Sequence, residues 1–329
     1  MTADSGLTDR PMIGILTQPG DVAYDGESYI SAGYVKWLES AGARIVPIPY
    51  DLEPHETRHL FKMVNGVFVP GGNYPLALHT RWFTTLQLLF DLTVEANDAG
   101  QHVPMHGTCL GLEALMTVIS RDGNLLESVD SENHPATLTF TPEAANSSLL
   151  SAVSRRVIDN LAKEPIAFHN HGFAMTEDGF ASTPALPAFF KVLSHSFDFN
   201  GKQYISIIEG RKYPFTGFAF HPEKTPYEFT PLLHIPHSPM AVEMSAQLAN
   251  AFVSQARMNG RQGRNVVEED CVLIYNFTPE FYGRHDYPEQ DRAFEQVYIF
   301  EAQRYRGVVA KAQAAQTQQL ASASVMSTR

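Results

Sequence analysis

Cys109 stands in a pattern that is typical of a reactive thiol. The pattern Gly-x-Cys-x-Gly at residues 107–111 joins a short apolar run, typical of a strand, to a longer one that is typical of a helix. A nucleophile on such a turn needs flanking glycines, because side chains there would collide with the neighbouring strand or helix. A helix N-terminus favours the thiolate of Cys109, and the N–H of Leu110 is placed to stabilise an oxyanion. The alternative is a buried structural cysteine beside a glycine turn.

A second group of residues could supply the base that a thiol nucleophile needs. The apolar run at 215–220 leads directly into His221-Pro222-Glu223. Residues i and i+2 of an extended chain face the same side, so Glu223 can reach the imidazole of His221. A base that is oriented by a third group is the usual partner of a nucleophilic cysteine. We therefore expect Cys109, His221 and Glu223 to form a catalytic triad.

The elements that must position these residues alternate along the first part of the chain. Strands are expected at 11–16, 44–48, 66–69 and 103–108, and helices at 28–40, 52–64 and 82–99. This alternation predicts the α/β class, with a doubly wound, mostly parallel central sheet flanked by helices. Sites in such sheets lie at the carboxyl ends of the strands. Gly71-Gly72 and Cys109 both fall at such ends.

Shorter, β-rich segments follow residue 121. We expect a hairpin around Asn200-Gly201, a long amphipathic helix at 239–258 and short strands at 271–275 and 297–300. From about residue 303 the chain is rich in Ala, Gln and Ser, which predicts a frayed helix or a disordered tail. The simplest organisation is one domain over residues 10–300, with flexible termini at 1–9 and 303–329.

Composition excludes some classes of function. The chain has 329 residues, 44% of them hydrophobic, and a net charge of −12, which argues against a nucleic-acid or anionic-membrane surface. No apolar run is long enough to span a bilayer. Two cysteines, Cys109 and Cys271, imply no disulfide framework. The first ten residues have no secretion-signal pattern, while sequons at Asn146 and Asn276 shift the expectation slightly toward a secreted origin, so the compartment stays open.

With these residues in view, the chain resembles the γ-glutamyl hydrolases, which belong to the glutamine-amidotransferase-like (flavodoxin-like) superfamily. The resemblance runs from about residue 10 to residue 300. Its motifs lie at 10–16, 34–44, 65–72, 107–113, 209–214, 220–228 and 298–300. Glutaminase domains of synthases share the cysteine turn and the His-x-Glu pattern. The stretches at 34–44 and 220–228 distinguish the hydrolases from them.

The resemblance implies hydrolysis of γ-glutamyl amide bonds in folate and antifolate poly-γ-glutamates. Cys109 would attack the γ-carbonyl and form a thioester, His221 would pass the proton to the leaving amine, and Glu223 would orient His221. The N–H groups of Gly72 and Leu110 would hold the oxyanion. The resemblance implies no metal and no organic cofactor.

Other residues receive roles through the same resemblance. His169 lies in a Phe-His pair that is functionally important in the family, and together with His171 it is expected to bind substrate. Gly71 and Lys224 are also expected at the substrate, Lys224 as a carboxylate contact. The alternatives are a surface histidine in a hairpin and a solvated or ion-paired lysine. The family further implies a homodimer, and a lysosomal, vacuolar or secreted location.

Three other functions stay open. One is hydrolysis of a different γ-glutamyl amide, such as a γ-glutamyl polyamine derivative, by the same triad. Another is the glutaminase subunit of a biosynthetic amidotransferase, which needs an ammonia tunnel and a synthase partner. The last is a non-catalytic relative, against which the intact Cys109, His221 and Glu223 argue.

Overall fold

The computed structural model describes residues 7–20, 27–260, 266–281, 294–301 and 305–315. Within these residues a central sheet has eight strands in the order β4-β1-β5-β6-β12-β11-β10-β8. The strands are β1 (Met12–Leu16), β4 (Arg44–Ile48), β5 (Gly66–Val69), β6 (Met105–Thr108), β8 (Thr139–Phe140), β10 (Phe190–Phe197), β11 (Gln203–Gly210) and β12 (Phe215–Phe218).

The sheet has a parallel half and an antiparallel half. Strands β4, β1, β5, β6 and β12 run parallel to one another, while β11, β10 and β8 pair antiparallel. The predicted α/β fold with a mostly parallel central sheet is therefore confirmed. The carboxyl ends of β5, β6 and β12 are neighbours along one edge, because these strands are adjacent and parallel.

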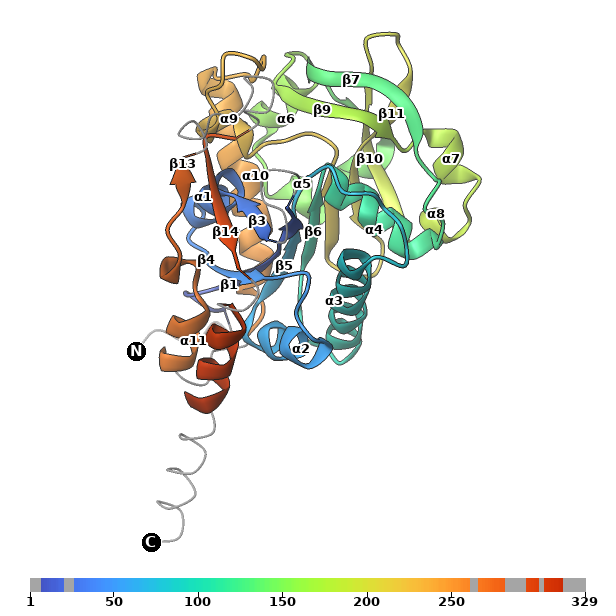
Figure 1. Cartoon of the computed structure of the whole chain (residues 1–329). Helices are drawn as coiled ribbons and strands as arrows, with labels where there is room; N and C mark the ends of the chain where they lie inside the picture. Colours follow the sequence, from blue (N-terminus) through green and yellow to red (C-terminus); the bar gives the residue numbers. More distant parts are fainter. Residues whose placement is uncertain (1–6, 21–26, 261–265, 282–293, 302–304, 316–329) are drawn as a thin grey trace, which may run out of the picture.

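Helices cover both faces of this sheet. Figure 1 shows α2, α3 and α4 on one side and α1 and α10 on the other. The helices are α1 (Ala32–Ser40), α2 (Pro54–Met63), α3 (Arg81–Asp98), α4 (Leu110–Ser120), α5 (Ser148–Ser151), α6 (Arg155–Leu161), α7 (Glu177–Ala181), α8 (Ala185–Phe189), α9 (Lys224–Tyr227), α10 (Pro239–Arg257) and α11 (Val266–Val272). No helix in the described parts of the chain is both long and apolar enough to cross a membrane.

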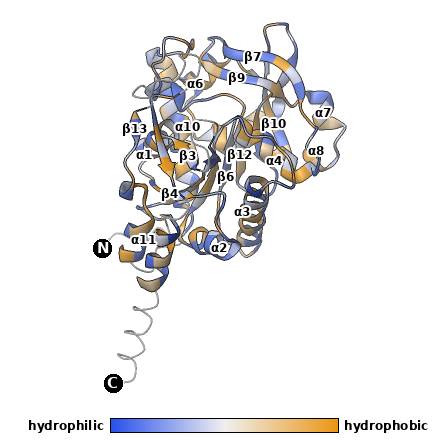
Figure 2. Cartoon of the chain, in the orientation of Figure 1, coloured by the Kyte–Doolittle hydropathy of each residue, from blue (hydrophilic) through white to orange (hydrophobic). Residues whose placement is uncertain are grey.

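Two smaller antiparallel sheets accompany the central one. One has the order β13-β14-β3-β2, with strands β2 (Gln18–Pro19), β3 (Ser28–Ser31), β13 (Glu280–Phe281) and β14 (Gln296–Phe300). The other pairs β7 (Glu127–Ala136) with β9 (Ala167–Ala174) and lies at the periphery (Figure 1). Hydrophilic residues are frequent along β7 and on α2, as Figure 2 shows. The β-rich segments predicted after residue 121 are thus present.

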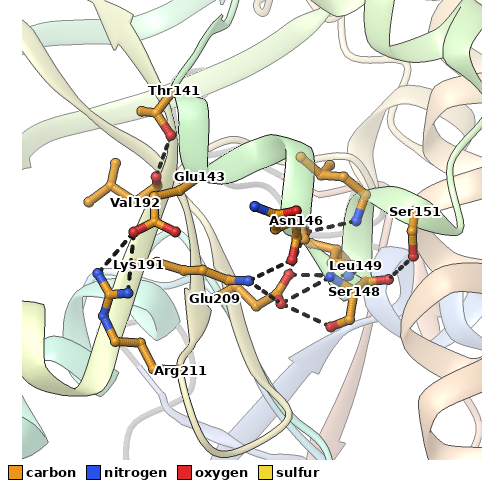
Figure 3. A network of polar contacts seen from close by, with 12 residues as sticks. Thr141, Glu143, Asn146, Ser148, Leu149, Ser151, Lys191, Val192, Glu209 and Arg211 are labelled. Atoms are coloured by element: carbon orange, nitrogen blue, oxygen red, sulfur yellow. Dashed lines mark hydrogen bonds and ion pairs between the residues drawn. The ribbon is translucent and has the colours of Figure 1, made fainter.

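A buried carboxylate connects β11 to the segment that precedes α6. Glu209 accepts hydrogen bonds from the N–H groups of Ser148 and Leu149, at 3.1 Å each, and from the hydroxyls of Ser147 and Ser148 (Figure 3). The ammonium of Lys191 lies 3.0 Å from the same carboxylate. These bonds satisfy a buried charge that would otherwise destabilise the fold.

The predicted strand at 271–275 is wrong. Cys271 lies in α11, and a 3-10 turn follows at Ile274–Asn276. The buried carboxylate of Glu269 pairs with Arg44 at 2.6 Å, so a contact from β4 holds this helix in place. Short apolar runs do not separate strand from helix by periodicity alone, and here tertiary contacts decide.

The predicted tail begins as a helix, which is one of the two alternatives that its composition indicates. Residues 305–315 form a helix in which Tyr305, Val309 and Ala312 are fully buried. The hydroxyl of Tyr305 donates a hydrogen bond to the carbonyl of Pro47 on β4. The remaining tail, 316–329, and residues 1–6 lie outside the described residues.

Candidate active site

Cys109 occupies a strained turn between β6 and α4. Its backbone has φ 53° and ψ −115°, a region that non-glycine residues rarely adopt, at a cost of about 1–3 kcal/mol. Its N–H donates to the carbonyl of Phe218 on β12 at 2.7 Å, which fixes the turn to the neighbouring strand. The predicted strand–turn–helix context of the cysteine is therefore confirmed.

The two flanking glycines are required by close backbone packing. A Cβ at Gly111 would lie 2.0 Å from the carbonyl oxygen of Val69 on β5. A Cβ at Gly107 would lie 2.4 Å from the carbonyl group of Gly111. Both contacts are with backbone atoms, so a rotamer change cannot relieve them.

The thiol of Cys109 is buried, and two opposing effects act on it. Burial raises its pKa, and the nearby Glu113 raises it further, whereas a hydrogen bond from the N–H of Leu110 lowers it. The net direction is upward, so the effect of the helix N-terminus does not by itself make a thiolate. Burial also raises the pKa of Glu113 to about 8, so this carboxyl is mostly neutral near pH 7 and its charge opposes the thiolate chiefly at higher pH. An anionic Cys109 therefore needs a cationic partner in the site.

His221 and Glu223 form a buried pair just beyond the end of β12. The Nδ1 atom of His221 is 2.7 Å from Oε1 of Glu223, and both side chains are at most 6% exposed. The N–H of His221 donates to the carbonyl of Phe168 on β9 at 2.8 Å, which anchors this segment to the smaller sheet. The predicted reach of Glu223 to the imidazole is confirmed.

Gly71 is the point at which Cys109 and His221 meet. A Cβ built on Gly71 would lie 2.9 Å from Cε1 of His221 and 3.2 Å from Cβ of Cys109. The same point is 2.6 Å from the hydroxyl oxygen of Tyr34. Residues from the ends of β5, β6 and β12 thus converge, as adjacent parallel strands predict.

The segment 70–72 is held on two sides. The N–H of Gly71 donates to the Tyr34 hydroxyl oxygen at 2.9 Å. The buried carboxamide of Gln18 donates to the carbonyl of Pro70 at 3.1 Å and packs against Gly72, where a Cβ would be 2.8 Å from Cδ of Gln18. Any side chain at Gly71 or Gly72 would displace these supports.

His169 and His171 lie on β9 and form a buried hydrogen-bonded chain. Ser196 donates to the carbonyl of Thr137 at 3.1 Å, so its oxygen accepts from Nε2 of His169 at 3.2 Å. His169 then accepts at Nδ1 from Nε2–H of His171, at 3.1 Å. Both nitrogens of the fully buried His169 are thereby used, which leaves Nδ1 of His171 without a hydrogen bond of standard geometry among the described residues.

Charge on this histidine pair is unfavourable. Burial lowers the pKa of His169 well below its usual range and that of His171 to about 3, and the positive charge of His221 nearby contributes in both cases. Both imidazoles are therefore neutral near pH 7. Neither side chain lies on the surface of a hairpin.

Lys224 directly follows the histidine segment and opens α9. Its side chain is 3% exposed, and its ammonium lies 4.7 Å from the centre of the Phe294 ring. The carboxyl of Glu228, one turn later, has a pKa raised to about 7 by burial, although Lys224 opposes this shift. Lys224 is thus a buried cation beside the site, and the alternative of a solvated surface lysine is wrong.

Sequence reasoning missed Tyr34 as a member of the site. It lies on the buried face of α1, where an aromatic residue in an apolar stripe is usually a core residue. Its spacing carries no functional signal, and only the fold brings its hydroxyl to Gly71.

The described residues contain no group of three His, Cys, Asp or Glu side chains arranged to hold a metal ion. A small cavity lies at the opposite end of β6 and β12, lined by Pro104, Ser148, Glu209 and Thr216 among others. This cavity is at the amino ends of the parallel strands, so it is separate from the Cys109 site.

The chain is similar in sequence to known proteins over most of its length. A family model described as glutamine amidotransferase class-I matches residues 22–234. Gamma-glutamyl hydrolase of Mus musculus is 38% identical over 297 residues, which cover 89% of this chain and 90% of that protein. The Homo sapiens gamma-glutamyl hydrolase is 37% identical with the same coverage. Gamma-glutamyl hydrolase 1 of Arabidopsis thaliana is 34% identical over 92% of this chain and 86% of that protein. Among solved structures, one described as a GMP synthase protein from Thermoplasma acidophilum gives a TM-score of 0.46 at 12% identity, over 74% of this chain and 94% of that one.

Proposed function

The chain belongs to the γ-glutamyl hydrolase family, an enzyme family that cleaves γ-glutamyl bonds, and from this premise we propose that its substrates are folate and antifolate poly-γ-glutamates. We propose further that Cys109, His221 and Glu223 carry the reaction. The convergence of Cys109 and His221 at Gly71 is the observation that supports this assignment most strongly. Side chains that follow β6 and β12 meet at a glycine that follows β5, and a Cβ on this glycine would fill the space between them.

In the first half of the reaction, the sulfur of Cys109 attacks the γ-carbonyl carbon of the scissile amide. The thiol proton passes to Nε2 of His221, and the resulting imidazolium is stabilised by Glu223 across the 2.7 Å contact. The tetrahedral oxyanion is held by the N–H groups of Gly72 and Leu110. His221 then protonates the leaving nitrogen, the C–N bond breaks, and a γ-glutamyl thioester remains on Cys109.

In the second half, water hydrolyses the thioester. His221 removes a proton from the water as its oxygen attacks the carbonyl carbon, and the C–S bond then breaks. Cys109 takes the proton back, and the glutamyl product leaves with a free γ-carboxyl group. Burial of the thiol favours its neutral resting form, so the thiolate develops together with the imidazolium during attack.

Substrate binding is assigned to residues around this centre. We assign substrate contacts to His171 and to the backbone of Gly71. His169 supports His171 through the hydrogen-bonded chain. Lys224 is assigned to the electrostatic attraction of substrate carboxylates. Two further proposals rest on the family alone: a homodimer in solution, and work in a lysosome, vacuole or secreted fluid.

The test is to incubate the protein with pteroyl-penta-γ-glutamate at mildly acidic pH and to identify products by mass. Shortened folates with free glutamate or glutamyl peptides, absent after iodoacetamide treatment, are the expected result. If the substrate stays intact while a γ-glutamyl polyamine or glutamine is hydrolysed, the triad stands and the folate assignment fails. If none of these compounds is cleaved, the catalytic assignment fails as well.

A further inference from the structure

Tyr34 has a buried hydroxyl that packing alone does not require. The residue is 2% exposed, and its ring packs against Phe68 with 5.4 Å between ring centres. A phenylalanine would fill the same space. Burying a hydroxyl is unfavourable unless it is hydrogen-bonded, so the contacts of this hydroxyl are informative.

The hydroxyl touches both halves of the site. Its oxygen accepts the N–H of Gly71 at 2.9 Å and lies 3.4 Å from Nδ1 of His221. Nδ1 of His221 is also 2.7 Å from Oε1 of Glu223, so the Tyr34 hydroxyl lies beside the His221–Glu223 pair, and the negative charge of Glu223 acts on it. The contacts run from Gly71 through Tyr34 to His221 and from His221 to Glu223.

The Tyr34 hydroxyl keeps its proton and lies beside both groups. Burial and the charge of Glu223 raise the pKa of Tyr34 well above its usual value, so the phenol stays protonated. Its oxygen accepts the N–H of Gly71 and lies 3.4 Å from Nδ1 of His221, so one hydroxyl group touches both groups. The N–H of Gly71 is thereby occupied, which leaves Gly72 as the donor of this segment for an oxyanion.

We propose that Tyr34 is a positioning residue: its hydroxyl fixes the oxyanion segment 70–72 and the His221–Glu223 pair relative to each other. This proposal rests on the proposed triad. Without the hydroxyl, the two groups lose their common support, and both the imidazolium and the oxyanion are stabilised less. The effect is expected on the chemical step and not on substrate binding, since the hydroxyl is occupied by protein groups.

The test compares Tyr34→Phe with Tyr305→Phe. Both changes remove one buried phenolic hydroxyl, but the Tyr305 hydroxyl bonds to Pro47, away from the site. For Tyr34→Phe we expect kcat on pteroyl-penta-γ-glutamate to fall roughly 10-fold, as the loss of a hydrogen bond to a charged group predicts, with KM within about two-fold. Tyr305→Phe should keep kcat. Equal kcat in wild type and Tyr34→Phe, or an equal loss in both variants, overturns the proposal.

A second readout needs no substrate. The rate at which iodoacetamide alkylates Cys109, followed by peptide mass mapping, reports how readily the thiolate forms beside His221. We expect this rate to fall several-fold in Tyr34→Phe and to stay unchanged in Tyr305→Phe. If wild type does not cleave the folate substrate, the proposed function fails, and this rate alone decides the role of Tyr34.

Thermal unfolding of each variant precedes the kinetics. If Tyr34→Phe does not fold, two amino acids of similar volume are placed at position 34. 4-Methylphenylalanine has no hydrogen-bond donor on its ring, whereas 4-aminophenylalanine has an N–H donor. A higher kcat and faster alkylation of Cys109 with 4-aminophenylalanine than with 4-methylphenylalanine support the proposal. Equal values for the two residues contradict it.

Discussion

At Cys109 the backbone and the surroundings of the side chain act in opposite directions. The helix start and the N–H of Leu110 favour a thiolate, whereas burial and Glu113 disfavour it, and the pKa is raised overall. A nucleophile with a neutral resting thiol depends on its base at the moment of attack. The base role that we propose for His221 is therefore consistent with the raised pKa of Cys109.

This dependence gives a prediction for His221. We expect His221→Asn to lower kcat by about 100-fold or more, because general acid–base catalysis contributes factors of that size. The matched control is His55→Gln, which removes an exposed histidine from α2. Steady-state kinetics on the folate substrate measure both variants. An unchanged kcat in His221→Asn would assign the base to another residue, with His171 the first to examine.

The geometry of single residues was predictable from sequence where it depends on a local pattern. The Cys109 turn and the His221–Glu223 contact follow from glycine spacing and from the i, i+2 geometry of an extended chain. Tyr34 was not predictable, since its hydroxyl meets Gly71 only through the packing of α1 against the sheet. Nor was the buried chain of His169, His171 and Ser196, which joins two different sheets.

At the scale of elements, long periodic segments were predicted well and short ones were not. The helices α3 and α10 carry stripes of buried residues over about five turns, and their predicted ends agree within one residue. The predicted helix at 28–40 is in fact β3 followed by α1, because pairing with β14 recruits its first four residues into a strand. Such pairing with a distant segment leaves no local signal.

The elbow glycines give a prediction at this scale. We expect Gly111→Ala to lower the free energy of unfolding by about 3 kcal/mol or more, because its Cβ would lie 2.0 Å from a backbone oxygen of β5. Gly307→Ala is the matched control, since a Cβ there meets nothing within 4 Å and helical alanine is favoured over glycine by roughly 0.5–1 kcal/mol. Urea unfolding measures both, and equal destabilisation would contradict the packing argument.

At the scale of the whole molecule, buried histidines lower the free energy of unfolding at acid pH, and buried glutamates lower it at alkaline pH. Burial lowers the pKa of His106 and His171 to about 3, so their stabilisation is complete above pH 6.5 and is lost as pH falls from there toward 3. Burial raises the pKa of Glu113 to about 8 and of Glu228 to about 7. Their stabilisation is complete below pH 4.5 and is lost as pH rises through those values.

We therefore expect the free energy of unfolding to be greatest at mildly acidic pH and to fall on either side, by up to about 1.4 kcal/mol per pH unit for each group. Urea unfolding across this range measures it. In Glu113→Gln the decline on the alkaline side should be smaller, while the acid side should not change. Stability that rises steadily to pH 9, or a Glu113→Gln curve parallel to that of wild type, would contradict this account.

The helix at residues 305–315 is ordered by packing against a distant part of the chain. Tyr305, Val309 and Ala312 are spaced as one helix face, yet they stand in a segment whose composition indicates disorder. Their partner surface includes β4, more than 250 residues earlier in the chain, as the Tyr305–Pro47 contact shows. Composition could not reveal that surface.

The most direct test of the central claim is the mass of Cys109 during turnover. The protein is mixed with excess pteroyl-penta-γ-glutamate, quenched in acid within the first turnover, and its Cys109 peptide is examined by mass spectrometry. The account predicts a γ-glutamyl or pteroyl-glutamyl thioester on Cys109 that disappears as substrate is exhausted and is absent in Cys109→Ala. Continued hydrolysis by Cys109→Ala, or an adduct on any other residue, would contradict it.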